Sequence, residues 1–231
     1  MKAIILAGGQ GKRIQELTNG LPKQMALVFG DYQMKHLLDR LPESIDELVV
    51  VTGNVGGDLL EEYIRKIIGK RKVTFTRQEM PTGTAHALLL AKPQVENEER
   101  FVVMYGDDLH DKESIEKCPQ YDFAMLVAEV PDPHRFGIVE LDKDNFVKSI
   151  EEKPENPKTN LASCGFFVFT PEIFDFKPFQ GPKGEYYLTS MLEGFIKSDG
   201  KIKAIKAKKW LPFNDPNDHK RVEDAFKKGL I

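Results

Sequence analysis

Two hydrophobic patterns alternate along the first half of the chain. Short apolar runs predict buried strands, and segments with apolar residues every three or four positions predict amphipathic helices. In chain order these are strand 3–7, helix 32–41, strand 47–52, helix 57–68, strand 72–76, helix 84–91 and strand 101–105. Strands that alternate with helices are typical of right-handed crossovers and a mainly parallel sheet flanked by helices. The pattern therefore predicts a Rossmann-like α/β fold.

The second half has a different pattern, in which strand-like runs are separated by turn-rich loops. The predicted strands cover 124–130, 137–141, 146–150, 164–169 and 203–207, and the predicted helices cover 189–197 and 217–228. No linker, repeat or low-complexity tract divides the chain. We therefore expect a mixed sheet in a single domain of residues 1–231, with a first half of about 1–120 and a second lobe of about 121–231.

Composition and charge narrow the class of protein. The 33 Lys and Arg residues against 36 Asp and Glu give a net charge of −3, which argues against a nucleic-acid-binding surface. No apolar run approaches the ~20 residues of a membrane span, and a strand that starts directly after Met1 and Lys2 leaves no room for a signal peptide. Cys118 and Cys164 form neither a disulfide framework nor a zinc set, and an inert thiol is expected at Cys164. We therefore expect a cytoplasmic protein that binds neither nucleic acid nor membranes.

The first predicted strand runs directly into a turn with three glycines between residues 8 and 11. Such a turn exposes backbone N–H groups that bind phosphate, and Arg13 and Lys23 add two positive charges. A P-loop is excluded because Arg13 stands where its hydroxyl residue should be, and the glycine spacing does not fit the dinucleotide fingerprint. Ligands of parallel sheets bind at the carboxyl ends of strands, so this turn and Asp107 should face one crevice. The combination suits a nucleoside triphosphate.

Residues 6–25 read LAGGQGKRIQELTNGLPKQM. This string resembles the signature of the nucleotidylyltransferases that activate sugar 1-phosphates, and Glu16 stands where that family usually has proline. The resemblance implies a glycosyltransferase-A-like nucleotidyltransferase fold, with a nucleotide-binding first half and a sugar-phosphate-binding lobe. It implies catalytic roles for Arg13 at the leaving pyrophosphate and for Lys23 at the reacting phosphates. The implied nucleotide contacts in this segment are Leu6, Ala7, Gly8 and Gly9.

The same resemblance bears on the length of the protein. Some members of the family carry a left-handed β-helix domain after the catalytic part. The chain shows none of the short-period repeats that such a domain requires. We therefore expect the short form of the family.

A second motif, from Gln78 to His86, has two interpretations on its residues alone. A glutamine side chain is both donor and acceptor, so this polar edge can face a nucleobase; it is equally a helix start capped by Thr82 or Thr84. The motif resembles the base-reading segment of uridylyl- and thymidylyltransferases of this family. The resemblance implies that Gln78 and Gly83 bind the pyrimidine edge with Thr84 close by, and His86 is expected to be a helix residue rather than a catalyst.

Adjacent carboxylates, Asp107 and Asp108, follow the last strand of the first half. A carboxylate at a strand end facing phosphates is a common Mg²⁺ arrangement, and the Gly-Asp pair resembles the family's metal site. The resemblance implies that Asp107 is the ligand, and Asp108 is expected to point outward. After the single tryptophan the sequence resembles a branch of the family that places an amide or acid at Asn214. Asn214 is therefore the expected second ligand and Asp215 the alternative, while Asp218 fits the first turn of the closing helix.

The remaining motifs fall in the second lobe. Residues 151–154 read EEKP and follow a predicted strand, where a solvated charged turn is the ordinary interpretation. They also resemble the family's Glu-Lys-Pro segment, which implies that Glu152 binds a sugar hydroxyl and that Lys153 is a catalytic residue at the sugar phosphate. The further sugar contacts implied by the resemblance are Gly137, Ser163 and Glu185.

Together the motifs predict a Mg²⁺-dependent enzyme that joins an NTP, UTP or dTTP, to a sugar 1-phosphate and releases pyrophosphate. A sugar phosphate oxygen attacks the α-phosphorus in line, so no protein nucleophile is needed. One alternative is a CTP-dependent cytidylyltransferase that acts on phosphocholine or a similar phospho-alcohol. The other is a non-catalytic sugar-nucleotide-binding regulatory protein, against which the presence of Arg13, Lys23, Asp107 and Lys153 argues.

Overall fold

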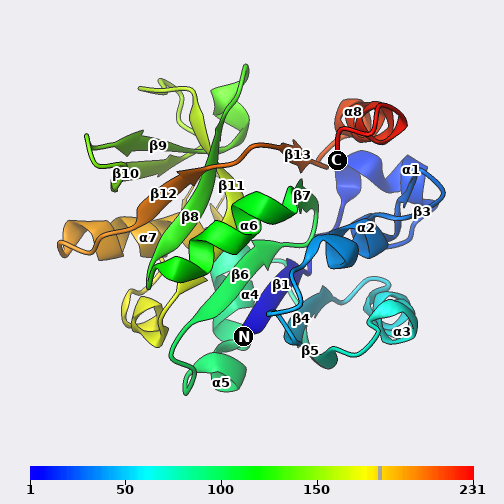
Figure 1. Ribbon diagram of the computed structural model, residues 1–231. Coiled ribbons are helices and arrows are strands. Elements are labelled where there is room, and N and C mark those ends of the chain that lie inside the picture. The colour runs from blue at the N-terminus through cyan, green and yellow to red at the C-terminus, as the bar shows by residue number, and fades with distance from the viewer. Residues whose placement is uncertain (182–183) are drawn as a thin grey trace.

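A mixed sheet flanked by helices runs through both halves of the chain (Figure 1). The computed structural model describes residues 1–181 and 184–231, and within them this sheet has nine strands. Its strands are β1 (Lys2–Ala7), β4 (Glu47–Gly53), β5 (Lys72–Gln78), β6 (Phe101–Tyr105), β8 (Ala124–Glu129), β9 (Gly137–Leu141), β10 (Val147–Glu152), β11 (Leu161–Phe169) and β12 (Lys203–Lys206). The predicted fold class is confirmed.

The strand order places the first half on one side of the sheet and the second half on the other. β1 lies between β4 and β6 with β5 beyond β4, and all of these pairs are parallel. β11 then pairs antiparallel with β6, and β8, β9, β10 and β12 continue the sheet from it. Because Leu6 is paired with Tyr105 and Ala7 with Thr52, the carboxyl ends of β1, β4 and β6 are level. The loops that follow these strands therefore meet at one edge.

Helices cover both faces because the strands are apolar on both faces. Ala3 and Ile5 of β1 belong to a core shared with α2 (Gln33–Arg40), α3 (Gly57–Ile67) and α6 (Lys112–Lys117). Ile4 and Leu6 point to a second core shared with α4 (Thr84–Leu90), α5 (Lys92–Val95) and α7 (Leu188–Lys197). Strand side chains alternate between faces, so a continuous apolar run is what a doubly covered sheet requires. Among the described residues no helix is both long and apolar enough to cross a bilayer.

The predicted elements agree closely with the structure, and the differences bear on the site. The strand predicted over 146–150 extends to Glu152, so Glu151 and Glu152 are strand residues rather than part of the following turn. Two small two-stranded sheets were not predicted. One pairs β2 (Leu27–Val28) with β3 (Asp31–Tyr32), and the other pairs β7 (Asp108–His110) with β13 (Trp210–Pro212). Strands this short carry no readable alternation.

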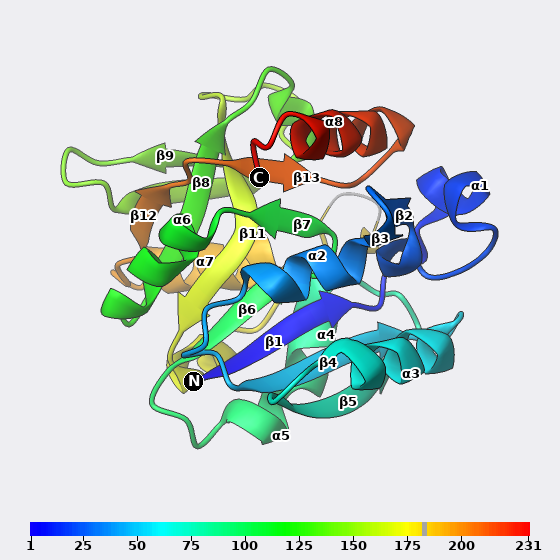
Figure 2. The same cartoon turned by 45° about the vertical axis from the view of Figure 1, so that its right-hand side comes forward.

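The β7–β13 pair brings the end of the chain back to the first half. After β13 the closing helix α8 (Pro216–Lys227) packs beside the β2–β3 hairpin and close to α1 (Gln15–Thr18), as Figure 2 shows. The rings of Phe29 and Phe226 stack with centroids 5.4 Å apart. This return places the segment just before α8 next to the glycine turn.

The sheet core yields a prediction on stability. Phe167 in β11 is fully buried and stacks on Phe169 at 5.4 Å, whereas Phe179 is 49% exposed. Phe167→Ala should lower the free energy of unfolding by about 3–5 kcal/mol, because it removes buried area and leaves a cavity. The matched Phe179→Ala should change it by less than about 0.5 kcal/mol. Urea denaturation measures both, and equal effects would contradict this assignment of the core.

Candidate active site

A cleft of about 450 Å³ lies at the carboxyl ends of the parallel strands and reaches into the second lobe. It gathers side chains from the beginning, middle and end of the chain. The predicted site residues that line it are Leu6, Gly8, Gly9, Arg13, Lys23, Gln78, Gly83, Thr84, Asp107, Gly137, Glu152, Lys153, Ser163, Glu185 and Asn214. The expectation that the glycine turn and Asp107 face one crevice therefore agrees with the structure.

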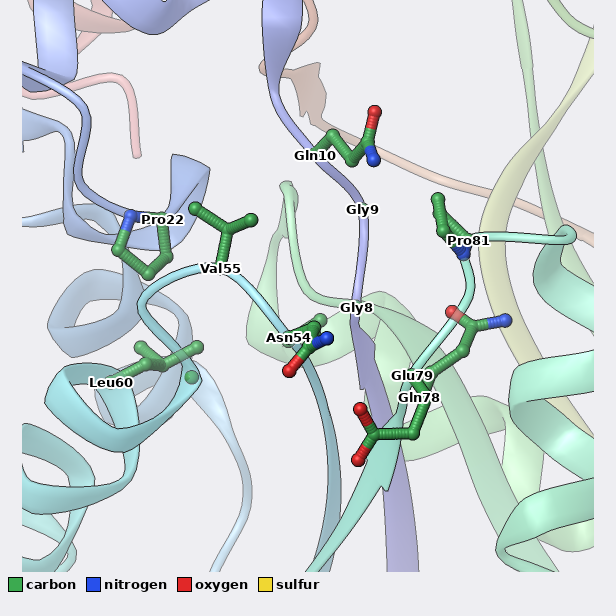
Figure 3. A pocket seen from close by; sticks show the side chains of 13 residues that line it. Gly8, Gly9, Gln10, Pro22, Asn54, Val55, Leu60, Gln78, Glu79 and Pro81 are labelled. Carbon is green, nitrogen blue, oxygen red and sulfur yellow. The ribbon is translucent and has the colours of Figure 1, made fainter.

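A smaller recess of about 30 Å³ adjoins the cleft at the glycine turn and shares Gly8, Gly9 and Gln78 with it. Its lining also includes the remaining predicted residue, Ala7. Figure 3 shows Gly8 and Gly9 running between Asn54 and Val55 on one side and Pro81 on the other. The glycine turn therefore lines both hollows.

Close approach of the backbone explains why glycine stands at the start of this turn. A Cβ added to Gly8 would lie 2.7 Å from Oε1 of Gln78 and 3.4 Å from the Thr52 carbonyl oxygen. Any larger residue would push Gln78 away from the end of β1. The glycine therefore serves the contact between two strand ends and leaves backbone N–H groups accessible.

The loop after β5 is pinned to the second lobe. Gly83 has φ +115°, and an added Cβ would collide with the Tyr186 carbonyl oxygen. The Ala85 N–H donates to that oxygen at 2.9 Å, and the Leu188 N–H donates to Thr84 Oγ1 at 2.8 Å. These bonds fix the start of α4 against the segment before α7. The helix start lies where it was expected, but the cap expected from Thr82 or Thr84 is wrong, because Gly83 is the N-cap residue of α4 and no side chain caps it. Thr82 Oγ1 lies beside His86 Nδ1 instead.

Lys23, Asp107 and Asn214 meet in the cleft, although they are far apart in the sequence. Lys23 is 7% exposed, and its Nζ forms an ion pair with Asp107 Oδ2 and donates to Asn214 Oδ1 at 3.0 Å. Two oxygen atoms from opposite parts of the chain therefore surround one cation. The predicted pair of metal ligands lies together, with the lysine ammonium between them.

Asp215, the alternative ligand, has other partners. Its Oδ1 caps α8 by accepting the N–H groups of Asn217 and Asp218 at 2.9 and 3.0 Å, and its Oδ2 pairs with Arg135 at 2.8 Å. Asp218 lies in the first turn of α8, as expected, and is fully buried. Its Oδ2 accepts the Asn214 N–H at 3.0 Å and pairs with Arg135 at 2.7 Å. These contacts direct Asn214, and not Asp215, into the cleft.

The expectation that Asp108 points outward is wrong. Asp108 is 4% exposed and lines the cleft beside Asp107. It opens β7, where it pairs with Pro212 of β13, so strand alternation restarts after the turn at Gly106 instead of continuing from β6. Burial, together with the neighbouring charge of Asp107, raises the pKa of Asp108 well above its usual range.

The second lobe supplies a polar wall opposite the glycine turn. Lys153 Nζ pairs with Glu152 Oε1 at 2.6 Å and lies 4.2 Å from the centre of the Tyr187 ring. Glu152 Oε2 accepts the Thr189 hydroxyl at 3.0 Å. Lys153 itself has φ +48°, an uncommon backbone conformation for a side chain of this size. Such strain is often found at functional positions.

Arg135 and Tyr187 also line the cleft, and the sequence analysis assigned them no role. Ser163, an expected sugar contact, lines the cleft with a buried hydroxyl that has no partner among the described residues. The available signal for Arg135 was its place two residues before Gly137, an expected sugar contact. The expected inert thiol at Cys164 is buried, and burial raises its pKa.

Comparison with known proteins is consistent with this geometry. Residues 2–213 match the family model described as Nucleotidyl transferase, so the chain belongs to the nucleotidyltransferase family. The prediction of a nucleotidyltransferase is confirmed at this level.

Two relatives are similar in sequence. The bifunctional protein GlmU of Methanocaldococcus jannaschii is 33% identical over 89% of this chain, which spans about half (49%) of that protein. The UTP–glucose-1-phosphate uridylyltransferase AglF of Haloferax volcanii is 32% identical over 98% of this chain and 96% of its own length.

Solved structures share the fold. A UDP-glucose pyrophosphorylase in complex with UDP-glucose has a TM-score of 0.85 at 24% identity, over 99% of this chain and 98% of its own. The inositol-1-phosphate CTP transferase of T. maritima has a TM-score of 0.82 at 22% identity, over 100% of this chain and 97% of its own. The same architecture thus serves acceptors of different chemistry.

His110, under the site in β7, yields a prediction on pH. It is buried, its Nε2 lies 2.7 Å from the Cys164 carbonyl oxygen, and burial lowers its pKa to about 4. The unfolded chain then binds a proton near pH 6.5 that the folded protein does not. The stability that neutral His110 contributes is therefore fully present above pH 6.5, and it is lost as the pH falls from 6.5 toward 4.

Between pH 7.5 and pH 5 the free energy of unfolding should fall by about 2 kcal/mol more in wild type than in His110→Gln. Glutamine keeps a hydrogen-bond donor but does not titrate. Urea denaturation at the two pH values measures the difference. Equal losses would show that His110 is not the group that titrates.

Proposed function

We propose that this protein transfers the nucleotidyl group of UTP or dTTP to a sugar 1-phosphate and releases pyrophosphate, with Mg²⁺ as cofactor. One observation carries the proposal: a single cleft contains the glycine turn, Arg13, Lys23, Asp107 and Lys153. Membership of the nucleotidyltransferase family supports the type of reaction. The relative AglF, a UTP–glucose-1-phosphate uridylyltransferase, supports the pair of substrates.

The chain's own groups act by positioning and by charge. The glycine turn would hold the triphosphate, and Arg13, which is exposed at the rim, would stabilise the leaving pyrophosphate with its forked guanidinium. Lys23 and Lys153 approach from opposite sides and would hold the reacting phosphates. The sugar phosphate oxygen then attacks the α-phosphorus in line. In this division of labour residues 1–120 bind the nucleotide and residues 121–231 bind the acceptor, within one domain.

The residues present fit a magnesium ion. Asp107 and Asn214 already share one cation, the Lys23 ammonium, and hard oxygen donors are what Mg²⁺ prefers. No group of three or more His, Cys, Asp or Glu suited to a metal occurs within residues 1–181 and 184–231, so phosphates and water would complete the coordination. Bound there, the ion would supply neutralisation of the charge around the α-phosphate.

The residues of the second lobe that line the cleft favour a sugar 1-phosphate over phosphocholine as the second substrate. A quaternary ammonium is recognised by free aromatic faces. Here Lys153 lies over Tyr187 at 4.2 Å and Arg135 lies over Phe136 at 5.4 Å, so these rings already carry cations. Glu152 and Ser163 offer hydrogen-bonding groups that suit hydroxyls.

A pyrophosphate-release assay tests the proposal. It crosses five NTPs with a panel of sugar 1-phosphates, inositol 1-phosphate and phosphocholine, with and without EDTA. Turnover should be highest with UTP or dTTP and a sugar 1-phosphate. CTP with phosphocholine or inositol phosphate as the best pair would establish the cytidylyltransferase alternative instead, and binding without turnover across the panel would establish the regulatory one.

The role of Arg13 predicts a large catalytic effect. Arg13→Ala should lower kcat by at least about a hundredfold, because one charged donor at the leaving group contributes ~3 kcal/mol or more. Arg13→Lys should also fail largely, since a point charge does not replace a fork. Arg65→Ala on α3, outside the cleft, is the matched control. Near-normal turnover of Arg13→Ala with an intact fold would refute the assignment.

A second prediction distinguishes the proposed metal ligands Asp107 and Asn214 from their neighbour Asp215. Asp107→Asn should nearly abolish activity, because it removes the anionic ligand. Asn214→Ala should raise the Mg²⁺ concentration that gives half-maximal rate more than it lowers the saturated rate. Asp215→Ala should weaken the cap of α8 by about 1 kcal/mol with little change in Mg²⁺ dependence. Titration of the rate with Mg²⁺ measures all three, and an Asp215→Ala defect as deep as that of Asp107→Asn would make Asp215 the ligand.

A further inference from the structure

The amide nitrogen of Gln78 is held by the start of α4. Gln78 is 4% exposed, and its Nε2 donates to the Gly83 carbonyl oxygen at 3.0 Å and lies 3.2 Å from His86 Nδ1. Thr82 Oγ1 lies 2.7 Å from the same ring nitrogen. A carbonyl oxygen only accepts, so the amide must turn its nitrogen toward Gly83. The lone pair of His86 Nδ1 then faces the second amide hydrogen of Gln78, and Thr82 contacts the same nitrogen.

The amide oxygen is left for a ligand. A Cβ added to Gly8 would lie 2.7 Å from Gln78 Oε1, which places this oxygen at the glycine turn. Figure 3 shows the oxygen on the side of Gly8 and Gly9, with the nitrogen turned away. Within the described residues this oxygen accepts no hydrogen bond. Toward the cleft, Gln78 therefore presents an acceptor and no donor.

The groups that fix this orientation are themselves fixed. The Gly83 carbonyl oxygen also accepts the Ala87 N–H at 3.2 Å, and Tyr186 packs against the Gly83 backbone so closely that a Cβ has no room. Gly83 lines the cleft, whereas Thr82 and His86 do not. The two side chains therefore touch no substrate and act only through Gln78.

We infer that His86 and Thr82 are positioning residues that fix the hydrogen-bonding polarity of Gln78 and so select uracil or thymine over cytosine. The inference rests on the proposed function, because it requires a nucleobase beside Gln78. Uracil and thymine carry an N–H at ring position 3, which donates to an acceptor, whereas cytosine carries a lone pair there. Cytosine can offer a donor to the same oxygen only through its exocyclic amino group, which shifts the ring relative to the triphosphate.

The energetic reason is the cost of an unpaired polar contact. A site built around one hydrogen bond rejects a ligand that faces it with a second acceptor. Without the His86 acceptor, the amide keeps only the Gly83 bond and can rotate more easily. Discrimination should then fall while the reacting phosphates, bound elsewhere, are unaffected.

Three variants test the inference. His86→Leu removes the acceptor and keeps bulk, His86→Asn restores an acceptor oxygen near the Nδ1 position, and Thr82→Val removes the hydroxyl. His36→Leu is the matched control, because the His36 ring on α2 also contacts one backbone carbonyl. The readouts are kcat and KM with UTP and with CTP, together with calorimetric binding of both nucleotides in the absence of the sugar 1-phosphate.

In His86→Leu the ratio of kcat/KM for UTP over CTP should fall about tenfold, through KM, with kcat for UTP within about twofold of wild type. His86→Asn should keep most of the ratio, Thr82→Val should lower it less, and His36→Leu should leave it unchanged. An unchanged ratio in both His86→Leu and Thr82→Val, with both proteins folded, overturns the inference.

The binding measurement separates this result from the proposed function. If no acceptor gives turnover but UTP binds more tightly than CTP, and His86→Leu narrows that gap, the positioning role stands and the proposed acceptor class is wrong. If wild type binds CTP as tightly as UTP, the inference fails whatever the turnover.

Discussion

The contact of Lys23 with Asp107 and Asn214 joins three distant parts of the chain at one point, and much of the surrounding structure serves it. Lys23 follows the glycine turn, Asp107 follows β6, and Asn214 arrives from the second lobe along β13. A buried charge requires partners that hold their positions. The amide oxygen of Asn214 and the carboxylate oxygen of Asp107 are therefore held in place by the neighbouring elements.

Support for Asn214 comes from the start of α8. Asp215 caps the helix, while buried Asp218 accepts the Asn214 N–H and pairs with Arg135. Arg135 belongs to the loop between β8 and β9, so this ion pair links that loop of the second lobe to the segment that carries Asn214. The β7–β13 pair also holds this segment in place, because it pairs Pro212, two residues before Asn214, with Asp108.

Close backbone contact plays the corresponding part at the ends of β1 and β5. Gly8 allows Gln78 to approach the end of β1, and Gly83 allows the next loop to lie against Tyr186. A Cβ at Gly83 would collide with the Tyr186 backbone, and a Cβ at Gly8 would displace the Gln78 amide. The polarity of Gln78 follows from this packing, because the Gly83 carbonyl fixes which end of the amide faces the cleft.

The sequence by itself determined the elements whose signal is local. Continuous apolar runs predicted β1, β4, β5 and β6, and amphipathic spacing predicted α2, α3 and α4. The glycine turn, Gln78 and Asp107 reached one cleft, since parallel strands share a carboxyl edge. Only the tertiary structure decided the side on which Asp108 lies, which of Asn214 and Asp215 faces the cleft, and the orientation of Gln78. Each of these depends on a partner far away in the sequence, such as β13, Arg135 or Tyr186, and local periodicity carries no information about contacts at that range.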